Sequence, residues 1–462
     1  MDRWVSAERI AAAMAAGRTT AAAGVEEALE HIGKHDKVLN AFTTVTRERA
    51  RARARAVDKA QAQGQPVGPL AGVPFAVKNL FDVAGLPTLA GSKINRDRRP
   101  ASADATLIER LEAAGAVLVG ALNMGEYAYD FTGENVHDGP SRNPHDRERM
   151  TGGSSGGSGA AVAGGLVPIA LGSDTNGSIR VPSSFCGIFG LKPTYGRLSR
   201  AGTFPFVASL DHVGPLARSA RDLALAYDVM QGHDPEDPVS VKRPAEPILP
   251  QIGAGIDGLR IAIAGSPHFK QGASPEALEA LARVAKALEV TREIAIPEDA
   301  RARAAAFVIT SSEGGALHLE RLRSRTRDFD PVVRDRLIAG AMVPAPLVVK
   351  AQKFRRWYRL EVLKLFQTVD AILAPATPFT APRIGQQTML LDGREVPLRP
   401  NIGIYTQSIS FIGLPVVVVP VPLVPMPIGV QIIAAPWRED IALSIAHALE
   451  RSGAVAAQRP AE

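Results

Sequence analysis

Between about residues 70 and 230, short apolar runs alternate with stretches in which apolar residues recur three and four positions apart. A loop, GQPVGPLAGVP, leads into an apolar run that ends at Lys78, and the helix-like DATLIERLEAAGA is followed directly by VLVGALN. Short apolar runs are typical of buried strands, whereas spacing of three and four predicts an amphipathic helix. The alternation therefore predicts parallel βα units.

The second half of the chain returns to strands after a helical interruption. A stretch rich in Pro, Asp and Gly at about 231–258 precedes LRIAIAG, which predicts a strand, and about 300–368 is helix-rich. Apolar segments follow in VDAILAPAT, SISFIGLPVVVVP and IGVQIIAAP. Because apolar segments lie both before and after residues 75–190, where the candidate catalytic residues fall, we expect one discontinuous sheet instead of independent modules.

Residues 1 to about 62 have the pattern of helices broken by Gly17 and Gly33. The alanine-rich start is not a signal peptide on this interpretation, since Asp2, Arg3 and Glu8 interrupt any apolar core. We expect residues 1–62 to form a helical layer packed on one catalytic unit that spans residues 63–462 and includes the helical excursion at about 300–368.

Composition and charge exclude several classes of protein. Of the 462 residues, 46% are hydrophobic, but no apolar run reaches the roughly 18 residues of a membrane span. Residues 416–424 come nearest, and prolines within them predict a buried strand followed by a loop. The net charge of +6 is modest, and the arginines of RERARARARA spread around a helix, which favours a solvated helix over a nucleic-acid surface.

Cysteine and histidine usage narrows the chemistry further. A single cysteine, Cys186, excludes an internal disulfide framework and favours a reducing cytoplasm. The nine histidines show no metal-ligand spacing, so we expect neither a metal nor a cofactor.

The most unusual segment is TGGSSGGSGAAVAGGLVPIALGSDTNGSIR, residues 151–180. A flexible linker would not be followed at once by a buried strand, and a phosphate-binding loop would need a lysine directly after its glycines. A hydrolase elbow is formally present around Ser155, with His212 or His447 as base, but the strand that should precede it is missing. A two-serine site with a lysine base is the third possibility.

That segment resembles the amidase signature family, together with AGVPFAVKNLFDVAGLPTLAGS around Lys78 and MGEYAYDFTGENVHDGPSRNP from residue 124. The resemblance covers most of the chain. It implies an α/β fold with a large mixed sheet flanked by helices on both faces. It also implies that Ser178 is the nucleophile, that Ser154, on a cis peptide, is a proton relay, and that Lys78 is the base.

These residue types suit the chemistry. A serine hydroxyl attacks only when a base takes its proton, and lysine is a base only when neutral. From a reference pKa of about 10.4, neutrality at pH 7 costs roughly 4.6 kcal/mol, which burial can largely remove. Ser154 can accept a proton from one side and donate one to the other.

The segment SDTNGSIR supplies the remaining parts of the expected site. Its tight turn offers backbone N–H donors for an oxyanion hole, and relatives often have glycine where this chain has an asparagine; the residues are Thr175, Asn176, Gly177 and Ser178. Asp174 and Arg180 flank the turn and are expected to pair and hold it.

The resemblance implies hydrolysis of a small linear amide or acylurea through a seryl acyl-enzyme, with release of ammonia. An anionic substrate would need a cation, for which we consider Arg321, Arg323, Arg355 and Arg356. The resemblance also implies a small helical partner similar to the C subunit of tRNA-dependent amidotransferases, and allows a homo-oligomer. Three alternatives stay open: the A subunit of such an amidotransferase, an amidase for other amides, and a catalytically silent scaffold.

Overall fold

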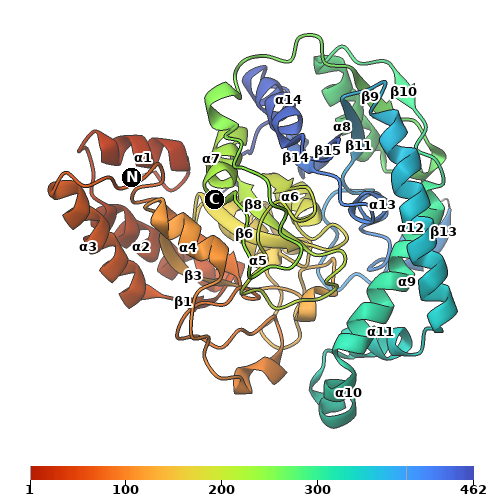
Figure 1. The fold of residues 1–462 in the computed structure, drawn as a ribbon, viewed down its shortest axis with the longest axis horizontal. Coiled ribbons are helices and arrows are strands. Elements are labelled where there is room, and N and C mark those ends of the chain that lie inside the picture. The colour runs from red at the N-terminus through yellow and green to blue at the C-terminus, as the bar shows by residue number, and fades with distance from the viewer. Residues whose placement is uncertain (1, 392, 462) are drawn as a thin grey trace.

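A mixed sheet of eleven strands forms the centre of the molecule (Figure 1). The computed structural model describes residues 2–391 and 393–461. In spatial order the strands are β1 (Phe42–Val45), β3 (Val117–Leu122), β2 (Pro74–Lys78), β6 (Ile169–Asp174), β8 (His212–Ala217), β7 (Phe189–Lys192), β14 (Val416–Val421), β15 (Ile428–Ala434), β11 (Ala371–Pro375), β9 (Ile261–Ala264) and β10 (Glu293–Ile294). Strands β3, β2 and β6 are parallel, whereas β8, β7, β14 and β15 pair antiparallel. The predicted mixed sheet is confirmed.

Both faces of this sheet are buried. On β2, Phe75 and Val77 belong to one apolar cluster and Ala76 to another, as expected when successive side chains point to opposite faces. Helices α4 (Thr106–Ala113) and α7 (Ala220–Met230) pack into the first cluster. Helices α2 (Ala21–Leu39), α3 (Arg47–Ala62) and α5 (Gly156–Ala163) pack into the second. The predicted helical cover on both faces is therefore confirmed.

The N-terminal segment is less purely helical than predicted. Helix α1 (Ala7–Ala15) ends before Gly17, but α2 continues through Gly33, and β1 lies inside the segment as an edge strand of the main sheet. A glycine inside a helix costs only about 1 kcal/mol, which the buried face of α2 offsets with Val25 and Leu29. The division at residue 62 into a layer and a catalytic unit stays a prediction.

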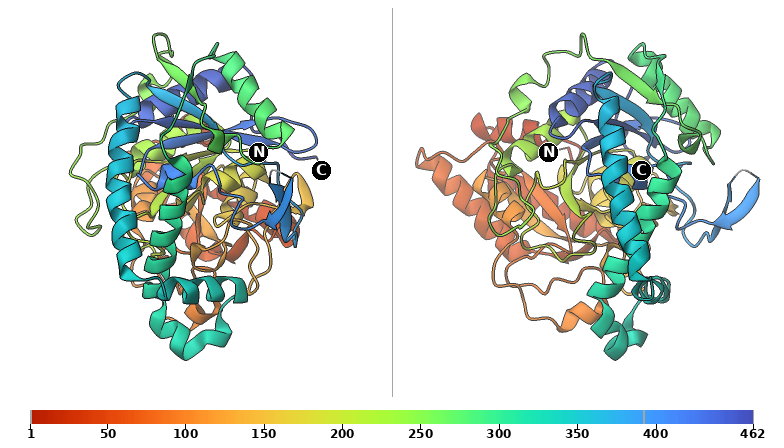
Figure 2. Two further views of the ribbon diagram at one scale, coloured as in Figure 1. Left: turned by 90° about the vertical axis from the view of Figure 1, so that its right-hand side faces the viewer. Right: turned by 45° about the vertical axis from the view of Figure 1, so that its right-hand side comes forward.

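The helix-rich stretch contains α9 (Asp299–Leu317), α10 (Leu319–Arg325), α11 (Pro331–Ala341) and α12 (Ala345–Leu365). Helices α9 and α12 lie side by side along one edge of the molecule. A hairpin of β12 (Thr388–Leu391) and β13 (Arg394–Pro397) projects from the body of the molecule (Figure 2). The remaining elements are β4 (Arg142–Asn143) and β5 (Asp146–Met150), which pair with each other, and α6 (Arg180–Cys186), α8 (Pro275–Ala287), α13 (Gln407–Ser410) and α14 (Glu439–Arg451). None of the described helices has the length and apolar character that a membrane crossing requires.

Candidate active site

The site lies where neighbouring strands end. Lys78 is the last residue of β2, and Ser173 and Asp174 are the last two of β6. Because β2 and β6 are parallel neighbours, their carboxyl ends meet at one edge of the sheet. Ser154 reaches the same place from the loop before α5, and Ser178 from the turn before α6. The structure thus brings together residues that lie far apart in the sequence.

Lys78 is completely buried, and its Nζ lies 2.7 Å from Ser154 Oγ and 2.8 Å from Ser173 Oγ. Burial lowers the pKa of Lys78 to about 7, although the carboxylates of Asp174 and Asp211 oppose that shift. The amine is therefore neutral in a large fraction of molecules at neutral pH. Ser173 was not among the predicted residues; its place next to Asp174 at a strand end was the only available signal.

Ser154 follows a cis peptide bond from Gly153, as the resemblance implies. Gly153 N–H donates to the carbonyl of Phe131 at 2.8 Å, and Ser155 N–H donates to the carbonyl of Ser178 at 3.3 Å. The second bond ties the loop of Ser154 to the turn of Ser178. Within the described chain no hydrogen bond joins the two hydroxyl groups directly.

The turn between β6 and α6 is held by a buried ion pair. Arg180 Nε and Nη2 each donate to the Asp174 carboxylate at 3.0 Å, and Asp174 Oδ2 also accepts from Ile179 N–H at 3.2 Å. Burial by itself would raise the pKa of Asp174, but Arg180 outweighs it and holds that pKa well below its usual range. The expected pairing of Asp174 with Arg180 is present in the structure.

Inside this turn several backbone donors are unused. Among the described residues, the N–H groups of Asn176, Gly177 and Ser178 have no hydrogen-bond acceptor. Gly177 has φ +145°, and a Cβ there would lie 2.3 Å from Thr406 Oγ1, so only glycine fits. The N–H of Thr175 likewise has no acceptor in the described part of the chain, and its hydroxyl donates to Asp211 Oδ1 at 2.6 Å. Adjacent free N–H groups are what an oxyanion hole requires.

Ser178 lines a narrow pocket. Lys78 and Ser154 are not among the residues that line it. Its walls come from the sheet edge and from helices α9, α11 and α13: Ala128, Tyr129, Asp130, Phe131, Thr175, Asn176, Ser178, Phe206, Phe307, Thr310, Arg336 and Gln407.

Arg336 is the cation on this wall, and the sequence did not single it out. Its Nη1 donates to the carbonyl of Tyr129 at 2.7 Å, and its guanidinium lies 3.6 Å from the centre of the Tyr129 ring. No carboxylate of the described residues pairs with Arg336. Asp130, on the same wall, is already paired with Arg399 at 2.8 Å. The pocket therefore offers one uncompensated positive charge.

The four arginines considered from the sequence lie elsewhere, so that expectation was wrong. Arg355 donates to the carbonyls of Ser209 and Phe411, and with Arg356 it lines a separate groove beside Trp437. Arg321 lies over the Phe204 ring, and Arg323 pairs with Glu320 at the surface. The spacing of residues along a helix does not show which face of which helix will meet the sheet edge. Helix α11 supplies the cation of the pocket, Arg336, and neither α10 nor α12 does.

The alternative nucleophile, Ser155, has a structural partner. Its hydroxyl donates to the Ser173 carbonyl at 3.2 Å, and neither His212 nor His447 hydrogen-bonds to it in the described residues. No strand leads directly into Ser155, because β5 ends at Met150 and a loop follows. The elbow geometry is absent from this part of the chain.

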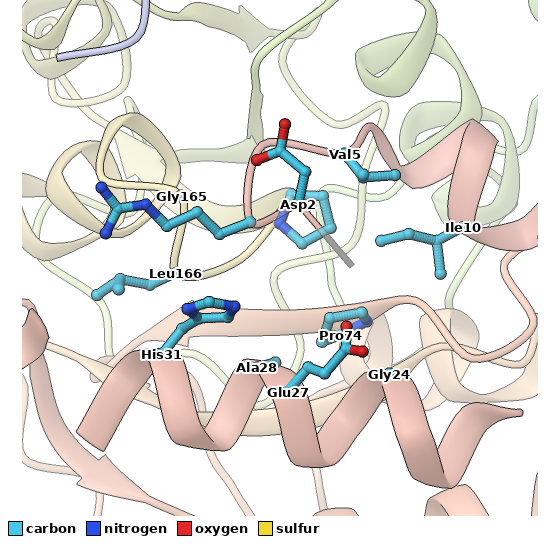
Figure 3. A pocket seen from close by; sticks show the side chains of 12 residues that line it. Asp2, Val5, Ile10, Gly24, Glu27, Ala28, His31, Pro74, Gly165 and Leu166 are labelled. Carbon is cyan, nitrogen blue, oxygen red and sulfur yellow. The ribbon is translucent and has the colours of Figure 1, made fainter. Parts of the chain in front are cut away.

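Another pocket, between the N-terminal residues and α2, contains none of the predicted site residues (Figure 3). His31 and Glu27 project from α2 toward Asp2, and Gly165 and Leu166 form the opposite wall. It holds no serine, so it is no candidate for the same chemistry. Among the described residues, no group of three or more His, Cys, Asp or Glu side chains could hold a metal ion.

The buried amine of Lys78 thus lies against two serine hydroxyls where β2 and β6 end, and Ser178 lines a pocket at the same edge of the sheet. A family model described as Amidase matches residues 23–443, and the chain belongs to this amidase family. The chain is 54% identical over 443 residues to the 1-carboxybiuret hydrolase subunit AtzE of Pseudomonas sp. strain ADP, covering 95% of this chain and 97% of that protein. It is 38% identical to the A subunit of the glutamyl-tRNA(Gln) amidotransferase of Azotobacter vinelandii, covering 96% of each chain.

Similar solved structures support the same family and fold. One, described as a vestigial protein complex that reveals the evolutionary origins of an s-triazine catabolic enzyme, matches with a TM-score of 0.97 and 53% identity over 98% of this chain and all of that one. A bacterial aryl acylamidase of the amidase signature family matches with a TM-score of 0.89 and 26% identity over 98% of this chain and 96% of that one. The predicted family, fold and amidohydrolase class are confirmed.

Proposed function

We propose that this chain hydrolyses a small anionic acylurea of the carboxybiuret type and releases ammonia, with Ser178 as nucleophile, Ser154 as relay and Lys78 as base. The observation that carries the substrate class is Arg336, an unpaired guanidinium in the pocket of Ser178. A carboxylate at the far end of the substrate would pair with it while the terminal amide reaches Ser178. Pairing two charges in a partly enclosed pocket is worth about 1.5–3 kcal/mol.

The first half of the reaction forms an acyl-enzyme. Ser178 Oγ attacks the terminal amide carbonyl as its proton passes through Ser154 to the neutral amine of Lys78, which lies 2.7 Å from Ser154 Oγ. The negative charge on the carbonyl oxygen would be held by the free N–H groups of the turn at 176–178, each worth about 3–4 kcal/mol in comparable sites. The proton then returns through Ser154 to the leaving nitrogen, the C–N bond breaks, and ammonia departs.

The second half reverses these roles. Water attacks the acyl group on Ser178 and gives its proton, through the same relay, to Lys78. The carbon–oxygen bond to Ser178 then breaks, and the serine regains a proton. The products are ammonia and a carbamate in which a carboxylate has replaced the terminal amide of the substrate.

The other interpretations have weaker support. The A subunit of an amidotransferase shares the same serines and lysine, but its identity to this chain is 38%, against 54% for the carboxybiuret hydrolase subunit. A silent scaffold would have no need of a buried lysine whose amine contacts two serine hydroxyls. We extend the proposal to a small helical partner subunit, supported by the complex described for the similar solved structure, and to a cytoplasmic location, supported by the single buried cysteine.

Covalent labelling tests the nucleophile. We expect a small serine-directed sulfonyl fluoride to modify Ser178 and stop ammonia release, with the adduct located by peptide mass spectrometry. Modification of Ser155 instead would support the elbow, and a protein that resists labelling and releases no ammonia from any amide would support the scaffold.

Substrate class is tested by replacing the cation. Arg336→Met should lower kcat/KM for anionic amides by about ten- to a hundredfold, the equivalent of about 1.5–3 kcal/mol, while a neutral amide changes little. Arg356→Met, outside the pocket, is the matched control and should leave both unchanged. Equal loss for charged and neutral amides would show that Arg336 only supports the wall.

A further inference from the structure

The side-chain amide of Asn176 is a polar group of the pocket turn that the reaction leaves without a role. Its Nδ2 donates to Thr310 Oγ1 on α9 at 2.8 Å. Its Oδ1 is buried and has no hydrogen-bond donor among the described residues. Asn176 lines the pocket two residues before Ser178. A buried acceptor without a donor is unfavourable by itself, and it becomes favourable when a donor occupies the pocket.

The position of this acceptor is fixed from two sides. The backbone carbonyl of Asn176 accepts from Thr406 Oγ1 at 2.6 Å, and the side chain is tied to the buried Thr310. Because Nδ2 is used by Thr310, the free atom of the amide is the oxygen, which can only accept. Asn176 therefore holds an unpaired acceptor in a side chain that lines the pocket of Ser178.

We propose that Asn176 Oδ1 accepts a hydrogen bond from an N–H of the substrate beside the scissile carbonyl and so selects ureido compounds over simple carboxamides. This inference rests on the proposed function and names its specificity-determining residue. In a ureido compound the atom on the far side of the carbonyl from the leaving nitrogen is an N–H, whereas in a simple carboxamide it is a CH₂ group. A site built to bond an N–H discriminates against an analogue that lacks it, because the buried acceptor is then left unpaired.

Two ligands of equal charge and nearly equal shape separate these groups. N-carbamoylglycine carries an N–H beside its terminal amide carbonyl, and succinamate carries a CH₂ in that place; both end in a carboxylate. Binding is measured by calorimetry in the Ser178→Ala protein, so that neither ligand reacts. We expect N-carbamoylglycine to bind at least tenfold more tightly than succinamate.

Removing the acceptor should abolish that preference. Asn176→Gly in the Ser178→Ala background should weaken N-carbamoylglycine by about ten- to a hundredfold and succinamate by less than threefold. Thr310→Val keeps the turn intact, frees the amide to rotate and should weaken the ureido ligand by about three- to tenfold, and Thr310→Ser should restore it. The threonine pair keeps the test available if Asn176→Gly does not fold.

Equal weakening of both ligands, equal affinity for both in the starting protein, or no binding of N-carbamoylglycine would each overturn the inference. Activity is scored separately in the protein with Ser178 intact. Selective binding without ammonia release from any ureido compound would refute the proposed function and leave the binding role of Asn176 standing.

Discussion

Lys78 and Lys192 are both completely buried, yet their amines meet different partners. Lys78 Nζ contacts two hydroxyl groups, Ser154 at 2.7 Å and Ser173 at 2.8 Å. Lys192 Nζ, at the end of β7, contacts two backbone carbonyls, those of Pro193 and Leu414. Burial lowers the pKa of each amine to about 7.

Burial alone therefore does not make a lysine amine a base. A hydroxyl can donate as well as accept, so it can hand a proton to a neutral amine. A carbonyl only accepts, so within the described residues Lys192 Nζ has no hydrogen-bond partner that could give it a proton. Both lysine amines have a pKa lowered to about 7, so the hydrogen-bond partners of each amine decide whether it can act as a base.

Replacing each lysine in turn tests most directly whether Lys78, and not Lys192, is the base. Lys78→Met should lower kcat/KM by about 10⁴-fold, at the upper end for loss of a general base. Lys192→Met should keep activity within about tenfold but reduce the free energy of unfolding by about 1–3 kcal/mol, because two buried carbonyls lose their donor. Ammonia-release kinetics and denaturant unfolding measure the two effects; the opposite pattern would assign the base to Lys192.

The two hydroxyl groups that contact the Lys78 amine are expected to differ in their effect on catalysis. Ser154→Ala should lower kcat by about 10³-fold because the proton path to Ser178 is broken. Ser173→Ala, which removes the other contact of the same amine, should cost only about fivefold, the rate equivalent of about 1 kcal/mol. Near-full turnover by Ser154→Ala would show that it is not the relay.

The smallest effect is a pH dependence. A base works when deprotonated, so kcat/KM should fall about tenfold for each pH unit below about 7, the pKa of Lys78, and level off above it. Lys192→Met should leave the midpoint in place. A flat profile from pH 5 to 8, measured at low substrate concentration, would contradict a neutral-lysine mechanism.

The sequence predicted the strands and the reacting groups better than the pocket walls. Apolar runs predicted β2 and β6, and the family resemblance pointed to Lys78, at the end of β2, and to Ser178, in the turn that follows β6. Arg336 escaped because a helix sequence shows which residues share a face, not which face of α11 will meet the sheet edge. The continuation of α2 through Gly33 was missed for a related reason: tertiary packing outweighed a local preference.

One wall of the pocket belongs to the stretch from α9 to α12, whereas Ser178 and Lys78, the proposed nucleophile and base, lie in a turn and at a strand end much earlier in the chain. Because these parts come from separate segments, the helical stretch can vary in sequence while the bond-breaking machinery stays constant. Chimeras that exchange residues 299–365 between relatives would then inherit the substrate preference of the donor. Members of such a family can acquire new substrates through changes in the pocket wall while the catalytic residues stay the same.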